Sequence, residues 1–458
     1  MTDLTWDVAV IGAGTAGLAA RDAATEAGAS TLLIEVGPYG TTCARVGCMP
    51  SKLLIEAGDA AHGVSHAALF GVHVGPGTID GAAVMQRVRA ERDRFVAGVL
   101  REVEAIPRAE RLTGHARFLD ANTLAVGEDT RVTARAVVVA TGARPTLPKP
   151  LPSVAERVLT HESVFEIDSL PETMAVLGAG PLGLELAQAF ARLGVRVTLL
   201  DPGQRIGGLR DDAISRVVAE VIGGELDLCL GAEVAQASVD GDGVRLIWTD
   251  AQGGEQARTF ARVLVAAGRP PALDGLDLDK AGLDLDEHGL PQVDQASLQC
   301  GRSAIFLAGD ADHDRPVLHE ASRQGTIAGR NAARYPDVEV PPRWVFLSMV
   351  FTDPGLAIVG RTADADRGDR SACLDYADQG RARMMGRNRG LLKVHADRDG
   401  TLVGAEMAMP GAEHVAHLIA WAVQEGMTAA HLLDRPFYHP TIEEGLKHAL
   451  NELVGRTG

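Results

Sequence analysis

Two stretches of the chain decide its fold: residues 8–35 read VAVIGAGTAGLAARDAATEAGASTLLIE, and residues 174–201 read MAVLGAGPLGLELAQAFARLGVRVTLLD. Each stretch opens with a short apolar run, continues with the pattern GxGxxG, and ends at an acidic residue. Every landmark in the first stretch has a counterpart at the same place in the second, including the later glycines Gly28 and Gly194. The chain therefore contains an internal repeat of one structural unit.

Each copy has the complete pattern of a dinucleotide-binding βαβ unit, in which a strand, a glycine-rich turn and a helix lead to a second strand ending in an acid. A single GxGxxG would also fit an ordinary tight turn, but two complete copies do not. The first glycine makes the turn, the second lets the backbone approach a pyrophosphate, and the third lets the helix pack on the strand. These positions are Gly12, Gly14 and Gly17 in the first copy and Gly178, Gly180 and Gly183 in the second.

The acids at the ends of the two copies, Glu35 and Asp201, are expected to bind ribose hydroxyls, while helix N-terminal amides hold the pyrophosphates. Two dinucleotide sites in one chain suggest a tightly held redox cofactor beside an exchanging nicotinamide, and a flavin is the usual intermediary. Three further apolar strands end where ligands of such sheets bind. They lead into Thr141-Gly142, Gly268-Arg269 and Asp310.

Composition excludes several classes of protein. The chain has 458 residues, of which 46% are hydrophobic and 23% charged, as in ordinary globular proteins. Its net charge of -17 disfavours a nucleic-acid partner. The longest uncharged runs, Val8–Ala20 and Thr173–Leu184, are shorter than the ~18 to 20 residues of a membrane helix. The acidic N-terminus is unlike a secretory signal, so we expect a cytoplasmic protein without membrane partners.

Cys43 and Cys48 are close in sequence, whereas Cys229, Cys300 and Cys373 are scattered. Residues five apart on an ideal helix are separated by a rise of ~7.5 Å, beyond the ~7 Å between Cα atoms that a disulfide allows. A bridge would therefore need a break in the helix, which Gly47 can provide. The pair admits three interpretations: a redox pair, two small buried residues, or part of a metal site. No second cysteine pair or CxxC spacing supports zinc, and we expect no metal.

The run TTCARVGCMPSK (residues 41–52), following the first repeat, resembles the active-site disulfide of the pyridine nucleotide-disulfide oxidoreductases, the flavoenzyme family that includes dihydrolipoamide dehydrogenase, glutathione reductase and mercuric reductase. The resemblance extends over nearly the whole chain, through ATGARP, FLAGDA, VFTDP and the late HPT. It implies an α/β fold with two Rossmann-like domains, for FAD and NAD, and a C-terminal α+β interface domain that forms a homodimer. Pro-rich connections between apolar runs predict the domain limits, at 1–148 (FAD, first part), 149–271 (NAD), 272–339 (return to the FAD domain) and 340–458 (interface).

The resemblance assigns residue roles. Cys43 matches the thiol that attacks the substrate, Cys48 the thiolate that contacts the flavin, and Lys52 the lysine near flavin N5, with Glu185 as its ion-pair partner. The alternative for Glu185 is a solvated helix residue. The residues implied for non-covalent FAD binding are Gly12, Gly14, Gly17, Glu35, Thr42, Lys52, Ala116, Thr141, Gly142, Asp310, His319 and Ala321. Those implied for NAD are Gly178, Gly180, Gly183, Glu185, Asp201, Gly268 and Arg269.

His439 and Glu444 admit two interpretations. Thr441 and Glu444 have the spacing of a capping box for a helix whose apolar face contains Leu446 and Leu450. The resemblance instead makes His439 the general acid and base for the substrate dithiol, held by Glu444, because an imidazole exchanges protons near neutral pH. Glu444 can both cap this helix and hold His439. In the family this histidine reaches the disulfide of the other subunit.

Three positions depart from the family pattern: Thr41 replaces a glycine, Asp353 stands where dihydrolipoamide dehydrogenases often have histidine, and Phe437-Tyr438 precede His439 in place of smaller residues. Asp201 favours NAD over NADP, although Arg205 and Arg210 follow it closely. Within the family we expect oxidation of dihydrolipoamide, or of lipoyl domains of a 2-oxo acid dehydrogenase complex, with NAD+. The alternatives are a glutathione- or mercuric-reductase-like enzyme, although no cysteine follows Cys373, and a flavoprotein subunit with a mainly binding role.

Overall fold

The computed structural model describes residues 2–75 and 77–455, and the chain divides into two compact units. The first unit combines the chain up to Pro50 with Arg89–Thr146 and Gly268–Arg343. The second combines Ser51–Val88, Leu147–Ala267 and the chain from Trp344 onward. None of the described helices is long and apolar enough to cross a membrane.

The first unit is built on a seven-stranded sheet in the order β3-β2-β1-β6-β5-β4, with β15 also paired to β6. Strands β1, β2, β3, β6 and β15 are parallel, and β4 and β5 are antiparallel additions. The strands are β1 (Thr2–Ile11), β2 (Thr31–Glu35), β3 (Arg111–Thr113), β4 (Ala116–Phe118), β5 (Thr123–Val126), β6 (Thr130–Val139) and β15 (Ile305–Leu307).

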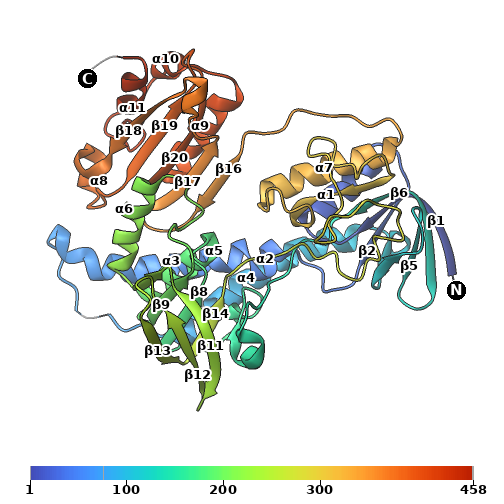
Figure 1. Ribbon diagram of the computed structural model, residues 1–458, viewed down its shortest axis with the longest axis horizontal. Helices are drawn as coiled ribbons and strands as arrows, with labels where there is room; N and C mark the ends of the chain where they lie inside the picture. Colours follow the sequence, from blue (N-terminus) through green and yellow to red (C-terminus); the bar gives the residue numbers. More distant parts are fainter. Residues whose placement is uncertain (1, 76, 456–458) are drawn as a thin grey trace. The chain divides into compact units, whose positions relative to one another are not determined.

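Helices α1 (Thr15–Glu26) and α7 (Leu318–Arg334) lie side by side in this unit (Figure 1). Glycines in α7 allow the close approach: a Cβ at Gly325 would lie 2.2 Å from the carbonyl oxygen of Ala16, and one at Gly329 would lie 2.1 Å from that of Ala20. Larger residues there would force the helices apart. Helix α7 also contacts the residue that follows the end of β15, where Gly309 N–H donates to Gln324 Oε1.

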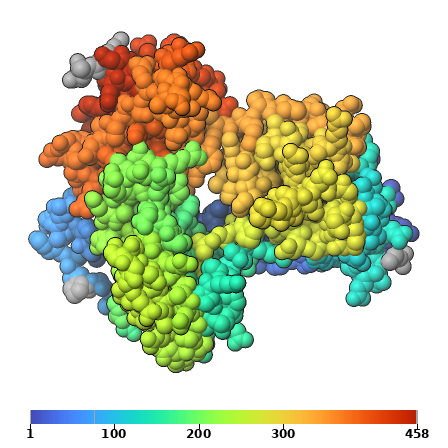
Figure 2. Space-filling view, in the orientation of Figure 1, coloured from blue at the N-terminus to red at the C-terminus, as the bar shows by residue number. Residues whose placement is uncertain are grey.

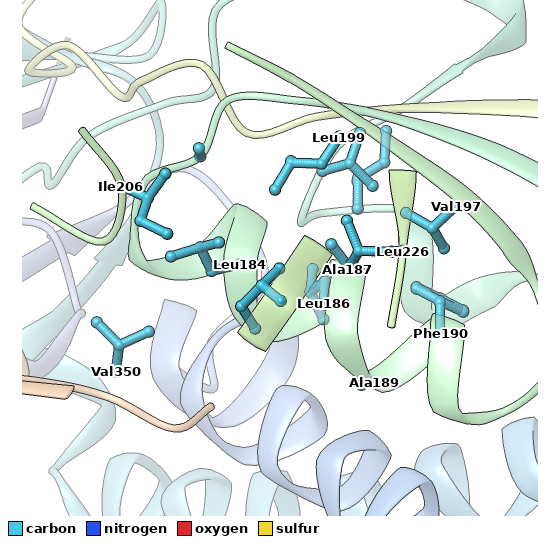
Figure 3. Close-up of a cluster of buried hydrophobic side chains, with 14 of the residues drawn as sticks. Leu184, Leu186, Ala187, Ala189, Phe190, Val197, Leu199, Ile206, Leu226 and Val350 are labelled. Atoms are coloured by element: carbon cyan, nitrogen blue, oxygen red, sulfur yellow. The ribbon is translucent and has the colours of Figure 1, made fainter. Parts of the chain in front are cut away.

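The second unit contains a five-stranded parallel sheet in the order β10-β9-β8-β14-β7. The repeated βαβ unit lies here as β8 (Thr173–Leu177), α5 (Pro181–Arg192) and β9 (Arg196–Asp201), followed by α6 (Asp212–Gly223) and β10 (Asp227–Leu230). Strands β7 (Val158–Leu159) and β14 (Arg262–Val265) complete the sheet. Figure 3 shows the core beneath it, where α5 side chains such as Leu184 and Phe190 gather with Leu199 of β9.

A three-stranded antiparallel sheet is formed by β11 (Glu233–Asp240), β12 (Gly243–Thr249) and β13 (Glu255–Phe260). Its residues, yellow-green in Figure 2, lie on the molecular surface, and most side chains of β11 and β13 are exposed. One face of β12 is buried against the parallel sheet, where Trp248 packs with Val263.

The C-terminal part of the second unit is a five-stranded antiparallel sheet in the order β16-β17-β20-β19-β18. Its core consists of alternating buried side chains and the apolar faces of α9 and α11. The elements are β16 (Leu347–Val350), β17 (Gly355–Gly360), β18 (Arg370–Asp375), β19 (Leu391–Ala396), β20 (Leu402–Met409), α9 (Ala412–Gln424), α10 (Ala429–Leu433) and α11 (Gly445–Leu453). This combination of parallel α/β sheets with an antiparallel α+β C-terminal part is the expected fold class. The expected four domain limits remain a prediction.

Candidate active site

The first glycine-rich turn is packed too closely for side chains at two of its three glycines. Gly12 has φ +105°, and a Cβ there would lie 2.3 Å from the carbonyl oxygen of Ala140. A Cβ at Gly17 would lie 1.8 Å from the carbonyl oxygen of Gly12. A Cβ at Gly14, in contrast, would meet no protein atom within 4 Å. The space next to Gly14 is therefore open, as expected where the backbone must approach a pyrophosphate closely.

A cavity of about 260 Å³ opens beside this turn. Its lining includes seven of the residues expected to bind FAD: Gly12, Gly14, Glu35, Thr42, Ala116, Thr141 and Gly142. The Thr141 hydroxyl is buried and has no hydrogen-bond partner among the described residues, so it is available to a polar ligand. The cavity is also lined by Thr41 and by four residues that the sequence did not single out: Arg45, His115, Arg144 and Asp274. Two of these four lie within quoted motifs, Arg45 in TTCARVGCMPSK and Arg144 in ATGARP.

The acids that end the two repeats are held in the same way. Glu35 Oε2 accepts from Ala13 N–H at 2.7 Å, and its other oxygen accepts from Val36 and Gly37 N–H. Asp201 accepts from Ala179 N–H and from Gly203 N–H, each at 2.6 Å. Each carboxylate is thereby fixed next to its glycine-rich turn, which is the position expected for binding a ribose.

The second turn repeats the packing of the first. Gly178 has φ +110°, and a Cβ there would lie 2.5 Å from the carbonyl oxygen of Ala266. A Cβ at Gly183 would lie 1.8 Å from the oxygen of Gly178, whereas Gly180 has open space around it. The turn leads into α5, so the helix N-terminus points its amides at this space.

The other residues expected around the flavin lie in the first unit near the end of β15. Asp310 is in a short 3-10 turn, and His319 and Ala321 are in the first turn of α7. Gly268 and Arg269, which we expected at the NAD site, also belong to this unit. The Arg269 guanidinium forms an ion pair of 2.9 Å with Asp310, the acid expected to bind the flavin's ribityl chain.

Both cysteines lie where the helix is interrupted. Cys43 is in α2 (Thr42–Val46), and Cys48 is the first residue of α3 (Cys48–His66). A Cβ on the intervening Gly47 would lie 3.0 Å from the carbonyl oxygen of Thr42 and 3.3 Å from the Cα of Cys43. The helix is therefore interrupted at Gly47, which has φ −121° and ψ −115°, and this is the break that a bridge requires. The bridge itself remains a prediction.

Thr41 departs from the family's glycine and has φ +56°, a left-handed conformation that costs a non-glycine residue about 1–3 kcal/mol. Its hydroxyl compensates in part, because it accepts a hydrogen bond of 3.2 Å from Ala44 N–H and caps α2.

The expected ion pair between Lys52 and Glu185 is present: Lys52 Nζ lies 2.7 Å from Glu185 Oε2. Lys52 is in the second turn of α3, and Glu185 follows the second glycine-rich turn on α5. The Glu185 side chain is only 5% exposed, which excludes the alternative of a solvated helix residue.

His439 donates from Nδ1 to Glu444 Oε2 at 2.9 Å, as expected. The imidazole is 80% exposed and Glu444 is 23% exposed. The capping box is wrong in detail, because α11 begins only at Gly445. The Thr441 hydroxyl donates to the Tyr438 carbonyl, and Glu444 accepts only a long 3.4 Å bond from Thr441 N–H. The main partner of Glu444 is therefore His439.

Comparison with known proteins identifies the family of the chain. Residues 6–325 match the model of the pyridine nucleotide-disulphide oxidoreductase family, and residues 347–450 match its dimerisation domain, which supports a homodimer. The chain is 31% identical to dihydrolipoyl dehydrogenase of Haloferax volcanii, over 98% of this chain and 96% of that one. It is also 31% identical to mercuric reductase of Streptomyces lividans, over 97% and 95%.

Among solved structures, LpdA of Mycobacterium tuberculosis superposes with a TM-score of 0.84 at 25% identity, covering 99% of this chain and 100% of that one. Enzymes of this family use FAD, with NAD(P)H as the second dinucleotide. The two glycine-rich turns, the cavity beside the first and the match over both domains place this chain in the pyridine nucleotide-disulfide oxidoreductases, as a flavin-dependent disulfide oxidoreductase.

Proposed function

We propose that this enzyme oxidises dihydrolipoamide, free or carried by the lipoyl domains of a 2-oxo acid dehydrogenase complex, with NAD+ as the electron acceptor. The observation that carries the proposal is the His439–Glu444 pair in a chain that also places Cys43 and Cys48 on either side of a helix break. Its dihydrolipoyl dehydrogenase relatives support the substrate.

The proposed chemistry is thiol–disulfide exchange. His439 takes a proton from one substrate thiol, and Nε2 is the ring nitrogen that faces away from the Glu444 bond. The thiolate attacks Cys43 Sγ, which breaks the Cys43–Cys48 bond and leaves Cys48 as a thiolate. The second substrate thiol then attacks the substrate sulfur of the mixed disulfide and breaks its bond to Cys43. Oxidised lipoamide leaves, and the proton of the second thiol passes to the departing sulfur, so that Cys43 is released as a thiol.

Glu444 orients the imidazole and stabilises its protonated form. Lys52 and Glu185 place a positive charge and its counter-charge in fixed positions on α3 and α5. The FAD would be held by the first glycine-rich turn, Glu35 and the Thr141 hydroxyl. When bound, FAD supplies the two-electron relay between the reduced cysteine pair and the nicotinamide.

Steady-state turnover tests the substrate. We expect kcat/KM for dihydrolipoamide with NAD+ to exceed kcat/KM for NAD(P)H-dependent reduction of glutathione disulfide by about 100-fold or more, because a site built for one dithiol leaves its polar groups unpaired with another substrate. Faster NAD(P)H oxidation with Hg²⁺ would instead favour the mercuric-reductase alternative. A protein that turned over only artificial acceptors would be a binding subunit.

NAD(H) is the preferred nicotinamide in this proposal. A 2′-phosphate about 4 Å from the Asp201 carboxylate would be repelled by up to about 4 kcal/mol per unit charge at an effective dielectric constant of ~20. The two arginines that follow Asp201 have other partners: Arg205 Nε pairs with Asp212 at 2.7 Å, and the Arg210 guanidinium lies 5.7 Å from the centroid of the Phe346 ring.

We therefore expect kcat/KM for NADH to exceed that for NADPH by about 100-fold, with screening reducing the full repulsion. Asp201→Ser should narrow this ratio by at least about tenfold, because it removes the repelling charge. Asp242→Asn, which changes the same charge in an exposed turn of the same unit, is the control and should leave the ratio unchanged. A wild-type preference for NADPH would contradict the assignment of Asp201.

A further inference from the structure

The segment Val350–Asp353, which ends β16 and contains the VFTDP motif, runs along one face of α5. Phe351 N–H donates to Glu185 Oε1 at 2.9 Å. Two residues on, Asp353 N–H donates to the Gln188 side chain at 2.8 Å, and Gln188 Nε2 donates back to the Asp353 carbonyl at 2.9 Å. Because positions three and four apart share a helix face, α5 holds the segment at successive turns.

Arg192, at the last turn of α5, completes this contact. Its guanidinium lies 3.2 Å from Asp353 Oδ2, pairs with Glu225, and lies 2.5 Å from Asp59 of α3. Burial by itself disfavours the charged form, but the hydrogen bonds and charges of these three carboxylates outweigh it and raise the pKa of Arg192. The Arg192 side chain is 4% exposed, so the Asp353 carboxylate is bound to a charge that does not move into solvent.

Phe351 contacts both members of the Lys52–Glu185 pair. Its N–H binds one oxygen of Glu185, whose other oxygen binds Lys52. Its ring centroid lies 4.5 Å from Lys52 Nζ, within the range of a cation–π interaction. The ammonium therefore has a carboxylate on one side and a ring face on another, which restrict the direction of a long and flexible side chain.

The preceding residue anchors the segment in the core. Val350 is 4% exposed and belongs to the apolar cluster that includes α5 residues, and Figure 3 shows it beside Leu184. Phe351 itself is 41% exposed, so it is not a core residue. The described contact of this exposed ring is with Lys52, and the contact of Phe351 with Glu185 is made by its backbone N–H.

We infer that Phe351, fixed to α5 through Asp353, is a positioning residue that holds Lys52 in place for flavin reduction. This inference rests on the proposed function and on the role near flavin N5 that the family resemblance implies for Lys52. It gives a role to the VFTDP motif, which the proposed chemistry did not use, and to Asp353, where the family often has histidine.

Phe351→Leu tests the inference because it keeps apolar bulk and the backbone N–H but removes the ring. We expect the rate of flavin reduction by NADH to fall about tenfold and its pH profile to shift, with FAD content and KM for dihydrolipoamide changed less than about twofold. Phe351→Tyr keeps the ring face and should restore the rate to within about twofold of wild type. Phe95→Leu is the matched control, since Phe95 is 44% exposed on α4 (Gly81–Ala105) in the other unit.

Asp353→Asn supplies a second test that leaves the ring in place. It should slow flavin reduction by about threefold, and adding it to Phe351→Leu should slow the reaction no further, because both changes act through Lys52. Full additivity, or a Phe351→Leu variant with wild-type rate and pH profile, would overturn the inference. If Phe351→Leu does not fold, a wild-type rate and pH profile in Asp353→Asn overturns it. A wild-type enzyme without dihydrolipoamide turnover would instead refute the proposed function.

Discussion

Cys43→Ser should abolish dihydrolipoamide oxidation, with a loss of at least about 10⁴-fold in kcat, because serine cannot form the mixed disulfide. The variant should still bind FAD and still transfer electrons from NADH to an artificial acceptor. Cys48, relieved of its partner, should remain as a thiolate against the flavin, so a long-wavelength absorbance band should be present without any reductant. Wild-type enzyme should show this band only after two-electron reduction.

Cys373→Ser is the matched control, because Cys373 lies on β18, and burial raises the pKa of its thiol above the ordinary value. It should retain wild-type activity and spectrum. A Cys43→Ser protein with near-normal dihydrolipoamide turnover, or a wild-type flavin that reduces without the band, would contradict the roles given to the two cysteines.

His439→Ala should lower kcat/KM for dihydrolipoamide by about 10²- to 10⁴-fold, the range for removal of a general base. The loss should be smallest at high pH, where substrate thiols ionise without help. Glu444→Gln should cost less, about tenfold, because it removes only the group that orients the imidazole. Reduction of artificial acceptors by NADH should not change in either variant. An unchanged kcat/KM in His439→Ala would exclude this residue as the base.

The His439 side chain is 80% exposed in the isolated chain. Mixed dimers therefore test whether this histidine acts on the cysteines of its own subunit or on those of the other. If the site is shared between subunits, mixing Cys43→Ser with His439→Ala chains should restore about a quarter of wild-type activity, because half of randomly mixed dimers are hybrids and each contains one intact pair. Hybrid dimers without recovered activity would mean that each subunit uses its own histidine.

Features with a local physical cause could be predicted from the sequence. The glycine spacing predicts both βαβ units because a backbone angle or a close contact requires glycine at these positions. Gly12 and Gly178 have positive φ, and Gly17 has no room for a Cβ. The rise along a helix predicted that a bridge between the cysteines would need a break, and the structure has one at Gly47. The Lys52–Glu185 and His439–Glu444 contacts were predicted through the family resemblance and not from spacing.

The remaining features depend on contacts that local patterns do not encode. Thr441 and Glu444 have capping-box spacing, but the preceding turn uses the Thr441 hydroxyl, so the helix starts later. The Arg269–Asp310 pair joins two residues that are far apart in the sequence and that follow strands of different sheets, so no local pattern predicts it. The contact between Phe351 N–H and Glu185 involves a backbone group, which carries no residue-specific signal in the sequence.

One helix serves two tasks in this molecule. The N-terminus of α5 faces the open space at Gly180, and the same helix carries Glu185, Gln188 and Arg192 on its buried side. Redesign of coenzyme preference through the Gly178–Gly183 turn would tilt this helix and disturb Lys52 at the same time. Under the proposed role of Asp201, substitutions at the end of β9 offer the safer route, since they change the contact with the adenosine ribose and leave α5 in place.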